Sequence, residues 1–275
     1  MLEARIPGMS ELRAIYGRIQ APRDEISIGG RLLTELRISY QASAQDLSNI
    51  PKSGPAILVL NHPMGLLEGA VLMEVLRSIR GDVKFLANGI LASIPELREW
   101  VISVDVMGNA VRDNIAGMRQ AVAHVASGGL LVVFPAGEVS HFQLRRMAVS
   151  DGEWHPSVAR LVSMAKRRRT GVKIVPAFVS GANSWLFQAA GLLHSRLRTA
   201  LLVRELLNKR ESTVELRVGS AIAAERLEEI ETDRERVDYL RWRCELLSAR
   251  QAFKANLAVI KTADEIEDSL LDITA

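Results

Sequence analysis

The sequence has almost no cysteine and no long hydrophobic run, and each absence excludes a class of protein. Cys244 is the single cysteine in 275 residues, so a disulfide framework within the chain is excluded and a reducing compartment is favoured. No stretch reaches the roughly 18 consecutive apolar residues of a membrane-spanning helix. The first residues, MLEARIPGMSELR, also lack the hydrophobic core of a signal peptide. We therefore expect the protein on the cytoplasmic side of a membrane.

Motifs of covalent and metal-dependent catalysis are missing as well. The chain contains no GxSxG sequence of the kind that presents a nucleophilic serine, and Cys244 falls in a charged, helical stretch where we expect no chemical role. The five histidines, none of them at close metal-ligand spacing, are His62, His124, His141, His155 and His194. We expect no metal, no cofactor and no nucleophilic side chain.

Hydropathy and charge favour contact with a membrane surface. Hydrophobic residues make up 48% of the chain and the mean hydropathy is +0.10, which are high values for a protein without a membrane span. The net charge of +3 allows anionic lipid, phosphorylated substrates or an acidic carrier protein as partners. The basic run 166–169 ends a predicted helix, where its cations suit the helix dipole. Nucleic acid is a weaker alternative, because no aromatic residues are interleaved with these cations.

Alternation of apolar strands with amphipathic helices predicts the fold. The predicted strands are 57–60, 83–87, 100–106, 130–134, 173–179 and 214–218, and the helices include 115–125, 158–169 and 184–207. We expect an α/β fold whose mostly parallel central sheet is flanked by helices. Pro176 suggests that its strand is at an edge, has a bulge or ends there. A helical N-terminal cap (1–50), the α/β core (51–220) and a C-terminal helical segment (221–275) would form a single domain.

The first predicted strand leads directly to a histidine. Residues 57–60 are wholly apolar, and His62 follows at the carboxyl end of the strand, the edge where α/β sheets bind ligands. In the next predicted helix, Glu68 lies within the apolar stripe, whereas Arg77 and Arg80 lie on the far side. A carboxylate that faces a core is costly unless it is paired. His62 is the natural partner for Glu68.

These two side chains can meet only if the chain between them is not helical. Six positions apart on one helix, His62 and Glu68 would point away from each other. Pro63 and Gly65 supply the residues of a turn. The predicted arrangement is a histidine base at a strand end, oriented by a carboxylate and without a nucleophile of its own. A lone histidine at a strand end is more often structural, so the pair by itself does not establish chemistry.

A second strand end has polar residues of the same kind. The strand 130–134 is followed by a glycine-containing loop with the carboxylate of Glu138 and the hydroxyl of Ser140. Because the carboxyl ends of parallel strands meet at one edge, the two strand ends are expected to share a site. His141 and His155 lie near this loop and are the reserve candidates for the base.

Three segments, in this order, resemble motifs of the glycerolipid acyltransferase superfamily, which is typified by lysophosphatidic acid acyltransferases. NHPMGLLEG (61–69) resembles the family's His-to-acid motif. FPAGEVS (134–140) resembles its FPEGTRS-type block, and KIVPAFV (173–179) resembles its proline-containing last strand. The chain resembles one bacterial branch of this superfamily, often labelled hemolysin, more specifically in the segments IPELREW, NSWLF and RELLNKRE. Members of that branch are similar to the O-acyltransferases of phospholipid and aminoacyl-lipid synthesis.

The resemblance implies direct acyl transfer. His62 would act as general base on the acceptor hydroxyl, Glu68 would fix its tautomer, and the hydroxyl would attack the thioester of an acyl-carrier protein or acyl-CoA. Backbone amides near Gly65 or Gly137 would stabilise the oxyanion. Further residues implied to bind substrate or hold the turns are Asn61, Arg112, Asn114, Pro135, Glu138 and Ser140. The implied acceptor is a lyso-lipid such as 1-acylglycerol-3-phosphate, at an anionic membrane surface.

Departures from the family pattern keep other acceptors and activities open. Five residues separate His62 from Glu68, whereas the usual motif has four and an aspartate, and Ala136 and Val139 replace a glutamate and an arginine of the second block. These changes in a phosphate-binding block make a lyso-aminolipid, of the ornithine or glycine lipid type, an alternative acceptor. A hydrolase that uses water and a non-catalytic lipid-interface protein are the alternatives from other classes.

Overall fold

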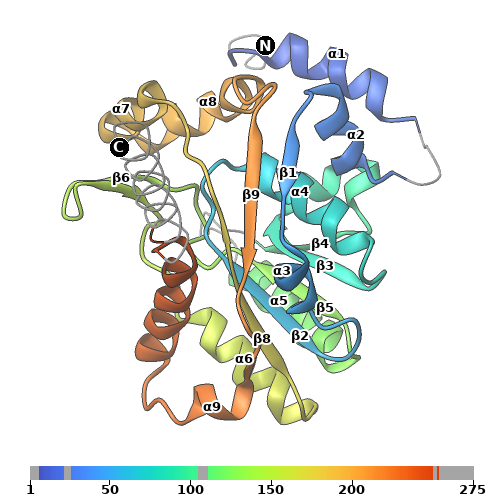
Figure 1. Cartoon of the computed structure of the whole chain (residues 1–275), viewed down its shortest axis with the longest axis vertical. Helices are drawn as coiled ribbons and strands as arrows, with labels where there is room; N and C mark the ends of the chain where they lie inside the picture. Colours follow the sequence, from blue (N-terminus) through green and yellow to red (C-terminus); the bar gives the residue numbers. More distant parts are fainter. Residues whose placement is uncertain (1–5, 22–25, 105–110, 250–252, 254–275) are drawn as a thin grey trace, which may run out of the picture.

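The chain folds around one eight-stranded sheet (Figure 1). The computed structural model describes residues 6–21, 26–104, 111–249 and 253, without the side chains of 111–113 and 195. The strands of the sheet are β1 (Ser39–Gln41), β2 (Ala56–Leu60), β3 (Val83–Asn88), β4 (Val101–Val104), β5 (Leu130–Val133), β8 (Lys173–Val179), β9 (Thr213–Val218) and β10 (Ile222–Ala223). Their order is β1-β9-β8-β2-β5-β3-β4, with β10 also beside β8. Strands β8, β2, β5, β3 and β4 are parallel, whereas β9 and β10 run antiparallel to β8.

Helices cover both faces of this sheet. The first face is covered by α1 (Met9–Ile19), α2 (Ile28–Glu35), α4 (Leu66–Arg77) and the end of α8 (Ser195–Leu207). The second face is covered by α5 (Val111–Ala126), α6 (Ser157–Arg168), α9 (Ala224–Glu228) and a helix over 233–249. The remaining elements are α3 (Ala44–Ser48), η2 (Gly89–Ser93), η3 (Pro95–Leu97), α7 (Trp185–Leu193) and a hairpin of β6 (His141–Gln143) and β7 (Ala148–Ser150). The predicted α/β fold with a mostly parallel, helix-flanked sheet is confirmed.

Strand β2 is the centre of the core. All five of its residues are completely buried, and they alternate between two apolar clusters: Leu58 and Leu60 pack toward α4, and Ile57 and Val59 toward α5 and α6. A strand buried on both faces can offer chemistry only beyond its ends. The predicted strand 57–60 therefore directs attention to the residues that follow Leu60.

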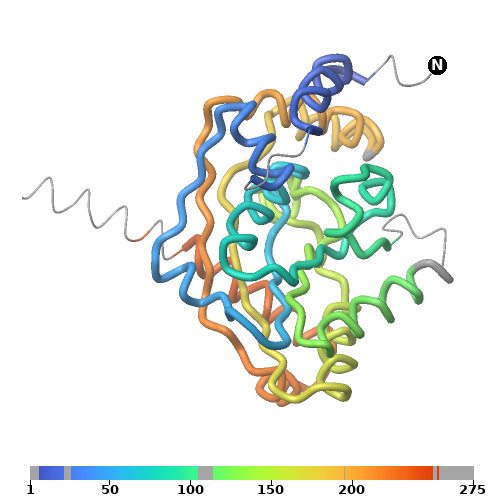
Figure 2. The backbone as a smooth tube through the Cα atoms, turned by 90° about the vertical axis from the view of Figure 1, so that its right-hand side faces the viewer, coloured from blue at the N-terminus to red at the C-terminus, as the bar shows by residue number. Residues whose placement is uncertain are grey.

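The N-terminal cap is not wholly helical, as 1–50 was expected to be. Residues 39–41 form β1, which pairs in parallel with β9, and α2 ends before Arg37, whose φ of 54° breaks the helix. The cap packs on the core, because Ile15 and Leu33 are buried in the cluster beneath it. Helix α1 also lies against α8, as the two views show together (Figures 1 and 2).

Pro176 lies in the middle of β8 and inside the sheet, so of the three places predicted for it, an edge, a bulge or a strand end, the edge and the strand end are wrong. Its strand β8 has β2 on one side and β9 and β10 on the other. The Pro176 carbonyl accepts a hydrogen bond from the N–H of Gly219, between the end of β9 and the start of β10. The N–H and C=O of one residue point to the same side of a strand, so the missing proline donor faces the break between these two strands.

The predicted helix 184–207 is interrupted at His194. This residue has an extended backbone (φ −165°, ψ 134°), and its Nδ1 accepts the N–H of Arg196, which caps α8. Arg80 differs from expectation too: it follows α4 and is buried instead of lying on a polar face. The hairpin of β6 and β7 was not predicted, because its three-residue strands are too short to show a period. The end of the predicted strand 100–106 lies outside the described residues, and β4 occupies the rest.

Among the helices of the described ranges, none combines the length and the apolar character needed to cross a bilayer.

Candidate active site

The predicted pair of His62 and Glu68 meets at the carboxyl end of β2. Nδ1 of His62 lies 2.7 Å from Oε1 of Glu68. The carboxylate is completely buried, whereas the imidazole is 20% exposed. Residues 63–65 form a bend, and α4 begins only at Leu66, so the chain between the two residues is not one continuous helix, as the spacing required.

Glu68 holds the turn as well as the histidine. Its Oε1 accepts the backbone N–H groups of Met64 and Gly65, each at 3.0 Å. These donors lie just before α4, where N–H groups have no partner within the helix and the helix dipole favours an anion. Gly65 has a φ of 94°, a conformation that side chains rarely adopt. The other oxygen of Glu68, Oε2, is buried without a partner among the described residues.

The contacts of Glu68 determine the histidine tautomer. An ionised carboxylate only accepts hydrogen bonds, so Nδ1 of His62 is the donor and Nε2 has the lone pair. The imidazole stacks on the ring of Phe134, with 4.3 Å between centroids and 29° between planes. The ring is therefore fixed in orientation, and Nε2 is the nitrogen that can accept a proton from a substrate.

The second predicted strand end lies next to the first. The N–H of Ser140 donates to the carbonyl of His62 at 2.8 Å. The Ser140 hydroxyl donates to Asp151, whose Oδ1 also accepts the N–H of His62 at 3.1 Å. Nε1 of Trp154 donates to the other oxygen of Asp151 at 2.8 Å. One buried carboxylate thus joins the histidine turn to the loop after β5.

Asp151 was missed by the sequence reasoning, as was the cation that holds its segment. The guanidinium of Arg241, in the helix over 233–249, donates to the carbonyls of Asp151 and Gly152 at 2.9 and 2.8 Å. Asp151 lies outside all three motif segments, and only its Asp-Gly turn sequence distinguishes it. No period or spacing relates it to His62.

Several predicted site residues are engaged within the protein. The Asn61 side chain pairs with both backbone groups of Val179, each at 2.8 Å, and so continues the pairing of β2 with β8. Pro135 is buried and accepts the N–H of His155 at 2.9 Å. These contacts, like those of Ser140, hold the strand ends in place.

The expected oxyanion donors have protein partners. The N–H of Gly65 donates to Glu68, and the N–H of Gly137 donates to the carbonyl of Phe134 at 3.0 Å. These two amides are engaged in this conformation, and stabilisation of the oxyanion by backbone amides of the turns around them stays a prediction.

Glu138 forms an ion pair across the site loop. Its Oε2 accepts a hydrogen bond from the guanidinium of Arg198 in α8 at 2.6 Å, and the Arg198 side chain is 9% exposed. Arg198 therefore brings a cation to the loop in which Val139 replaces the family's arginine. No local pattern predicts this pairing, because 60 positions separate the two residues.

The remaining candidates differ from His62 in their surroundings. Nδ1 of His141 lies 4.0 Å from Glu138, and Nδ1 of His155 accepts the N–H of Ser157. Among the described residues, neither has a buried carboxylate at hydrogen-bond distance. Asn114 lies in α5 and is half-buried, and the side chain of Arg112 lies outside the described part of the chain.

Helix α8 brings further charge to this region. The ammonium of Lys209, just beyond α8, donates to the carbonyl of Ala182 at 2.5 Å. Burial lowers the pKa of Lys209, while the carboxylates of Glu205 and Glu68 act in the opposite direction. Glu205 is completely buried and accepts the N–H and hydroxyl of Ser184 at 2.7 and 2.6 Å.

Two other chemistries find no support among the described residues. The described residues contain no group of three or more side chains able to hold a metal ion. Cys244 is buried with its Sγ 3.4 Å from the carbonyl of Val59, and burial raises the pKa of the thiol, which opposes thiolate formation.

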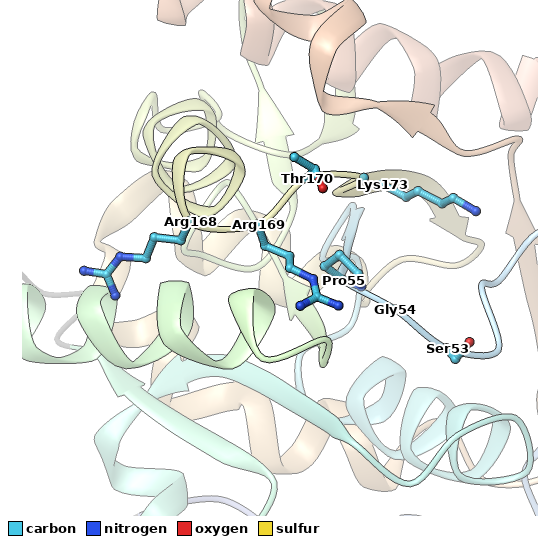
Figure 3. A pocket seen from close by; sticks show the side chains of 8 residues that line it. Ser53, Gly54, Pro55, Arg168, Arg169, Thr170 and Lys173 are labelled. Atoms are coloured by element: carbon cyan, nitrogen blue, oxygen red, sulfur yellow. The ribbon is translucent and has the colours of Figure 1, made fainter.

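A basic pocket of about 550 Å³ lies at the opposite end of the sheet (Figure 3). It lies beside Gly54 and Pro55, before β2, and Lys173, at the start of β8. In this view Arg169 extends beside Pro55, whereas Arg168 and Lys173 extend to opposite sides (Figure 3). These cations do not converge on one point. Because the pocket lies before β2 and His62 lies beyond the other end of that strand, the pocket is separate from the candidate active site.

Comparison with known proteins identifies the family. The family model described as "Acyltransferase" matches residues 22–252. The chain belongs to this acyltransferase family. The predicted acyltransferase membership, and with it the prediction of an enzyme, is confirmed.

Curated relatives of this acyltransferase are more distant. A lyso-glycine lipid O-acyltransferase of Phocaeicola vulgatus is 27% identical, over 67% of this chain and 65% of the relative, just under two thirds of its length. One of Bacteroides thetaiotaomicron is 25% identical, over 74% of each. The crystal structure of the 1-acyl-sn-glycerophosphate acyltransferase PlsC from Thermotoga maritima gives a TM-score of 0.46 at 17% identity, covering 88% of this chain and 89% of that one. At this TM-score we draw no conclusion from the likeness.

Proposed function

We propose that this acyltransferase moves a fatty acyl group from an acyl thioester to the hydroxyl group of a lyso-lipid. One observation carries the proposal: the buried Glu68 carboxylate lies 2.7 Å from Nδ1 of the partly exposed His62, which leaves Nε2 as the proton acceptor. This arrangement provides a general base with a fixed tautomer. Direct transfer to a hydroxyl requires that base and no nucleophile from the protein.

The reaction proceeds in two steps at His62. Nε2 takes the proton from the acceptor hydroxyl while the hydroxyl oxygen attacks the carbonyl carbon of the thioester. The tetrahedral intermediate then breaks its carbon–sulfur bond, and the departing thiolate takes the proton back from the imidazolium. The ester and the free thiol are the products. Glu68 stabilises the imidazolium between these steps and does not itself need to be protonated.

A lyso-aminolipid is the acceptor that we favour. Both curated relatives are named for a lyso-glycine lipid acceptor. The second motif also lacks the usual glutamate and arginine, since Ala136 and Val139 stand in their places. A 1-acylglycerol-3-phosphate acceptor is the competing proposal, because it is the default of the superfamily. The donor is an acyl-carrier protein or acyl-CoA thioester, and the reaction takes place at the cytoplasmic face of an anionic membrane.

Acyl transfer by the purified full-length chain tests this proposal. Labelled acyl-carrier protein and acyl-CoA are each supplied with lyso-glycine lipid, with 1-acylglycerol-3-phosphate, or with no acceptor. We expect labelled ester from lyso-glycine lipid. Label in 1-acylglycerol-3-phosphate alone would overturn the acceptor assignment. Free fatty acid at equal rates without an acceptor would instead indicate a hydrolase, and no turnover of any kind a lipid-interface protein.

A further inference from the structure

Helix α7 is apolar on its exposed face as well as on its buried face. Its sequence, WLFQAAGLL, contains no charged residue. Phe187 is completely buried, but Trp185, Leu192 and Leu193 are 79%, 55% and 80% exposed. Leu192 and Leu193 follow Trp185 by seven and eight positions, so the three side chains lie on one side of the helix. A helix that is apolar all round is normally buried, and this one leaves its largest side chains uncovered.

The neighbouring hairpin extends this exposed surface. Leu144 and Met147, at the turn between β6 and β7, are 67% and 74% exposed. The N–H of Phe142 in β6 donates to Oε1 of Gln188 in α7 at 2.9 Å, and the two elements lie side by side (Figure 1). We call the exposed residues of both elements the apolar patch: Leu144, Met147, Trp185, Leu192 and Leu193.

Within the two segments that contain the apolar patch, every charged side chain is cationic, and some of these cations pair with anions of neighbouring segments, as Arg146 does with Glu245 and Arg198 with Glu138. The segments 139–150 and 184–204, which contain the patch, include no aspartate or glutamate. Arg145 lies in the hairpin turn and Arg196 at the start of α8, and both are exposed. Exposed tryptophan and leucine beside arginine are the composition of segments that bind at the surface of an anionic bilayer. A second copy of this chain would bring the same cations against these arginines.

The apolar patch also borders the candidate active site. Strand β6 begins one residue after Ser140, whose N–H donates to the carbonyl of His62. Leu202 of α8 lies over the histidine turn, since a Cβ at Gly65 would be 3.3 Å from its Cδ2. We infer that the apolar patch docks this acyltransferase on an anionic lipid bilayer, with the His62 turn next to the membrane surface from which a lyso-lipid enters. This inference rests on the proposed function for its choice of partner.

Vesicle flotation of the full-length protein tests the docking surface directly. The vesicles contain phosphatidylcholine, with or without phosphatidylglycerol. For the double variant Trp185→Ser/Leu193→Ser we expect partition to fall by about tenfold or more, because interfacial binding scales with buried apolar area. Tyr40→Ser/Met164→Ser is the matched control, since both residues are exposed and belong to β1 and α6. It should float like the wild type. Arg145→Glu/Arg196→Glu should lose the preference for phosphatidylglycerol and the sensitivity to salt.

Kinetics separate a failure of docking from a failure of the proposed function. With monomeric lyso-lipid in detergent, Trp185→Ser/Leu193→Ser should match the wild type, whereas with acceptor in vesicles its rate should fall together with flotation. Wild-type flotation by this variant would overturn the inference. A change from dimer to monomer in this variant, with flotation unchanged, would also overturn the inference, because it would assign the patch to contact with a second copy of the chain. A wild-type protein that floats through the patch but acylates no lyso-lipid would overturn the proposed function and leave the docking surface standing.

Discussion

At the carboxyl end of the sheet a buried anion gathers backbone N–H groups, and at the amino end a buried cation gathers backbone carbonyls. The anion is Glu68, which accepts from Met64, Gly65 and His62. The cation is Arg80, whose side chain is 2% exposed. It donates to the carbonyls of Pro51, Gly54 and Gly128, which precede β2 and β5, and to Asp82, which precedes β3. Each charge fixes the geometry of adjacent strand ends.

The difference lies in what each charge leaves unused. All three guanidinium nitrogens of Arg80 donate hydrogen bonds, either to backbone carbonyls or to Asp82. Glu68 instead holds a side chain that is partly exposed and still has a free lone pair on Nε2. A buried charge at the strand ends therefore stabilises structure at the amino end of the sheet and orients a base at the carboxyl end. Substitutions at the two ends should separate activity from stability.

The largest expected effect is on the activity of His62→Ala. A general base contributes about 10²- to 10⁴-fold, so acyl transfer should fall by that factor. The fold should persist, with a loss of about 1 to 3 kcal/mol in the free energy of unfolding, because Glu68 loses one hydrogen bond while the His62 backbone contacts to Asp151 and Ser140 remain. Initial rates and urea unfolding measure the two quantities. Near wild-type rates in this variant would remove His62 from the mechanism and return His141 and His155 to consideration.

Glu68→Gln should reduce activity nearly as strongly while keeping the turn. The amide oxygen can still accept from Nδ1, Met64 and Gly65, but the charge that stabilises an imidazolium is lost. We expect a loss of about 10²-fold in kcat. Unfolding should become easier by about 1 to 3 kcal/mol, because the amide NH₂ replaces the unpartnered Oε2 and is a buried donor without an acceptor. If kcat were unchanged, Glu68 would be a structural residue like Arg80.

Arg80→Met tests the opposite end of the sheet. Three partly buried carbonyl groups lose their donor, so we expect the free energy of unfolding to fall by about 2 to 3 kcal/mol. Activity per folded molecule should equal that of the wild type, because Arg80 lies at the other end of the strands from His62. Chemical denaturation and rate measurements below the unfolding midpoint provide the check. A loss of kcat without a loss of stability would contradict the proposed division between the two ends.

The sequence predicted the active end of the sheet better than the structural end. The apolar run 57–60, the position of Glu68 on an apolar stripe and the intervening turn residues predicted the pair with His62, because each signal is local. Arg80 was assigned to a polar face by helical projection, but the helix ends at Arg77 and the projection no longer applies. A period carries information only within its element.

Contacts between distant segments could not be predicted in this way. Asp151 meets His62 across 89 positions, and Arg198 meets Glu138 across 60. Both contacts depend on how the loop after β5, the hairpin and α8 fold over one another, and no spacing in a single sequence encodes that. Strand β1 was missed for a related reason, since three exposed residues become a strand only through pairing with β9.

The smallest expected effect is the pH dependence contributed by Asp82. The hydrogen bonds from Arg80 hold the pKa of this carboxyl below its usual value, and burial acts against them. A carboxyl whose pKa is lower in the folded state stabilises the fold fully above its unfolded pKa of about 3.9, and the contribution is lost as the pH falls through the folded value. The stability difference between wild type and Asp82→Asn should therefore be present at neutral pH and shrink as the pH falls below the unfolded value of about 3.9. Thermal unfolding at a series of pH values measures it. A difference that stays constant over this range would mean that the Arg80 cluster depends on its carbonyl contacts and not on the charge of Asp82. That outcome would sharpen the contrast with Glu68, where the charge itself is expected to matter.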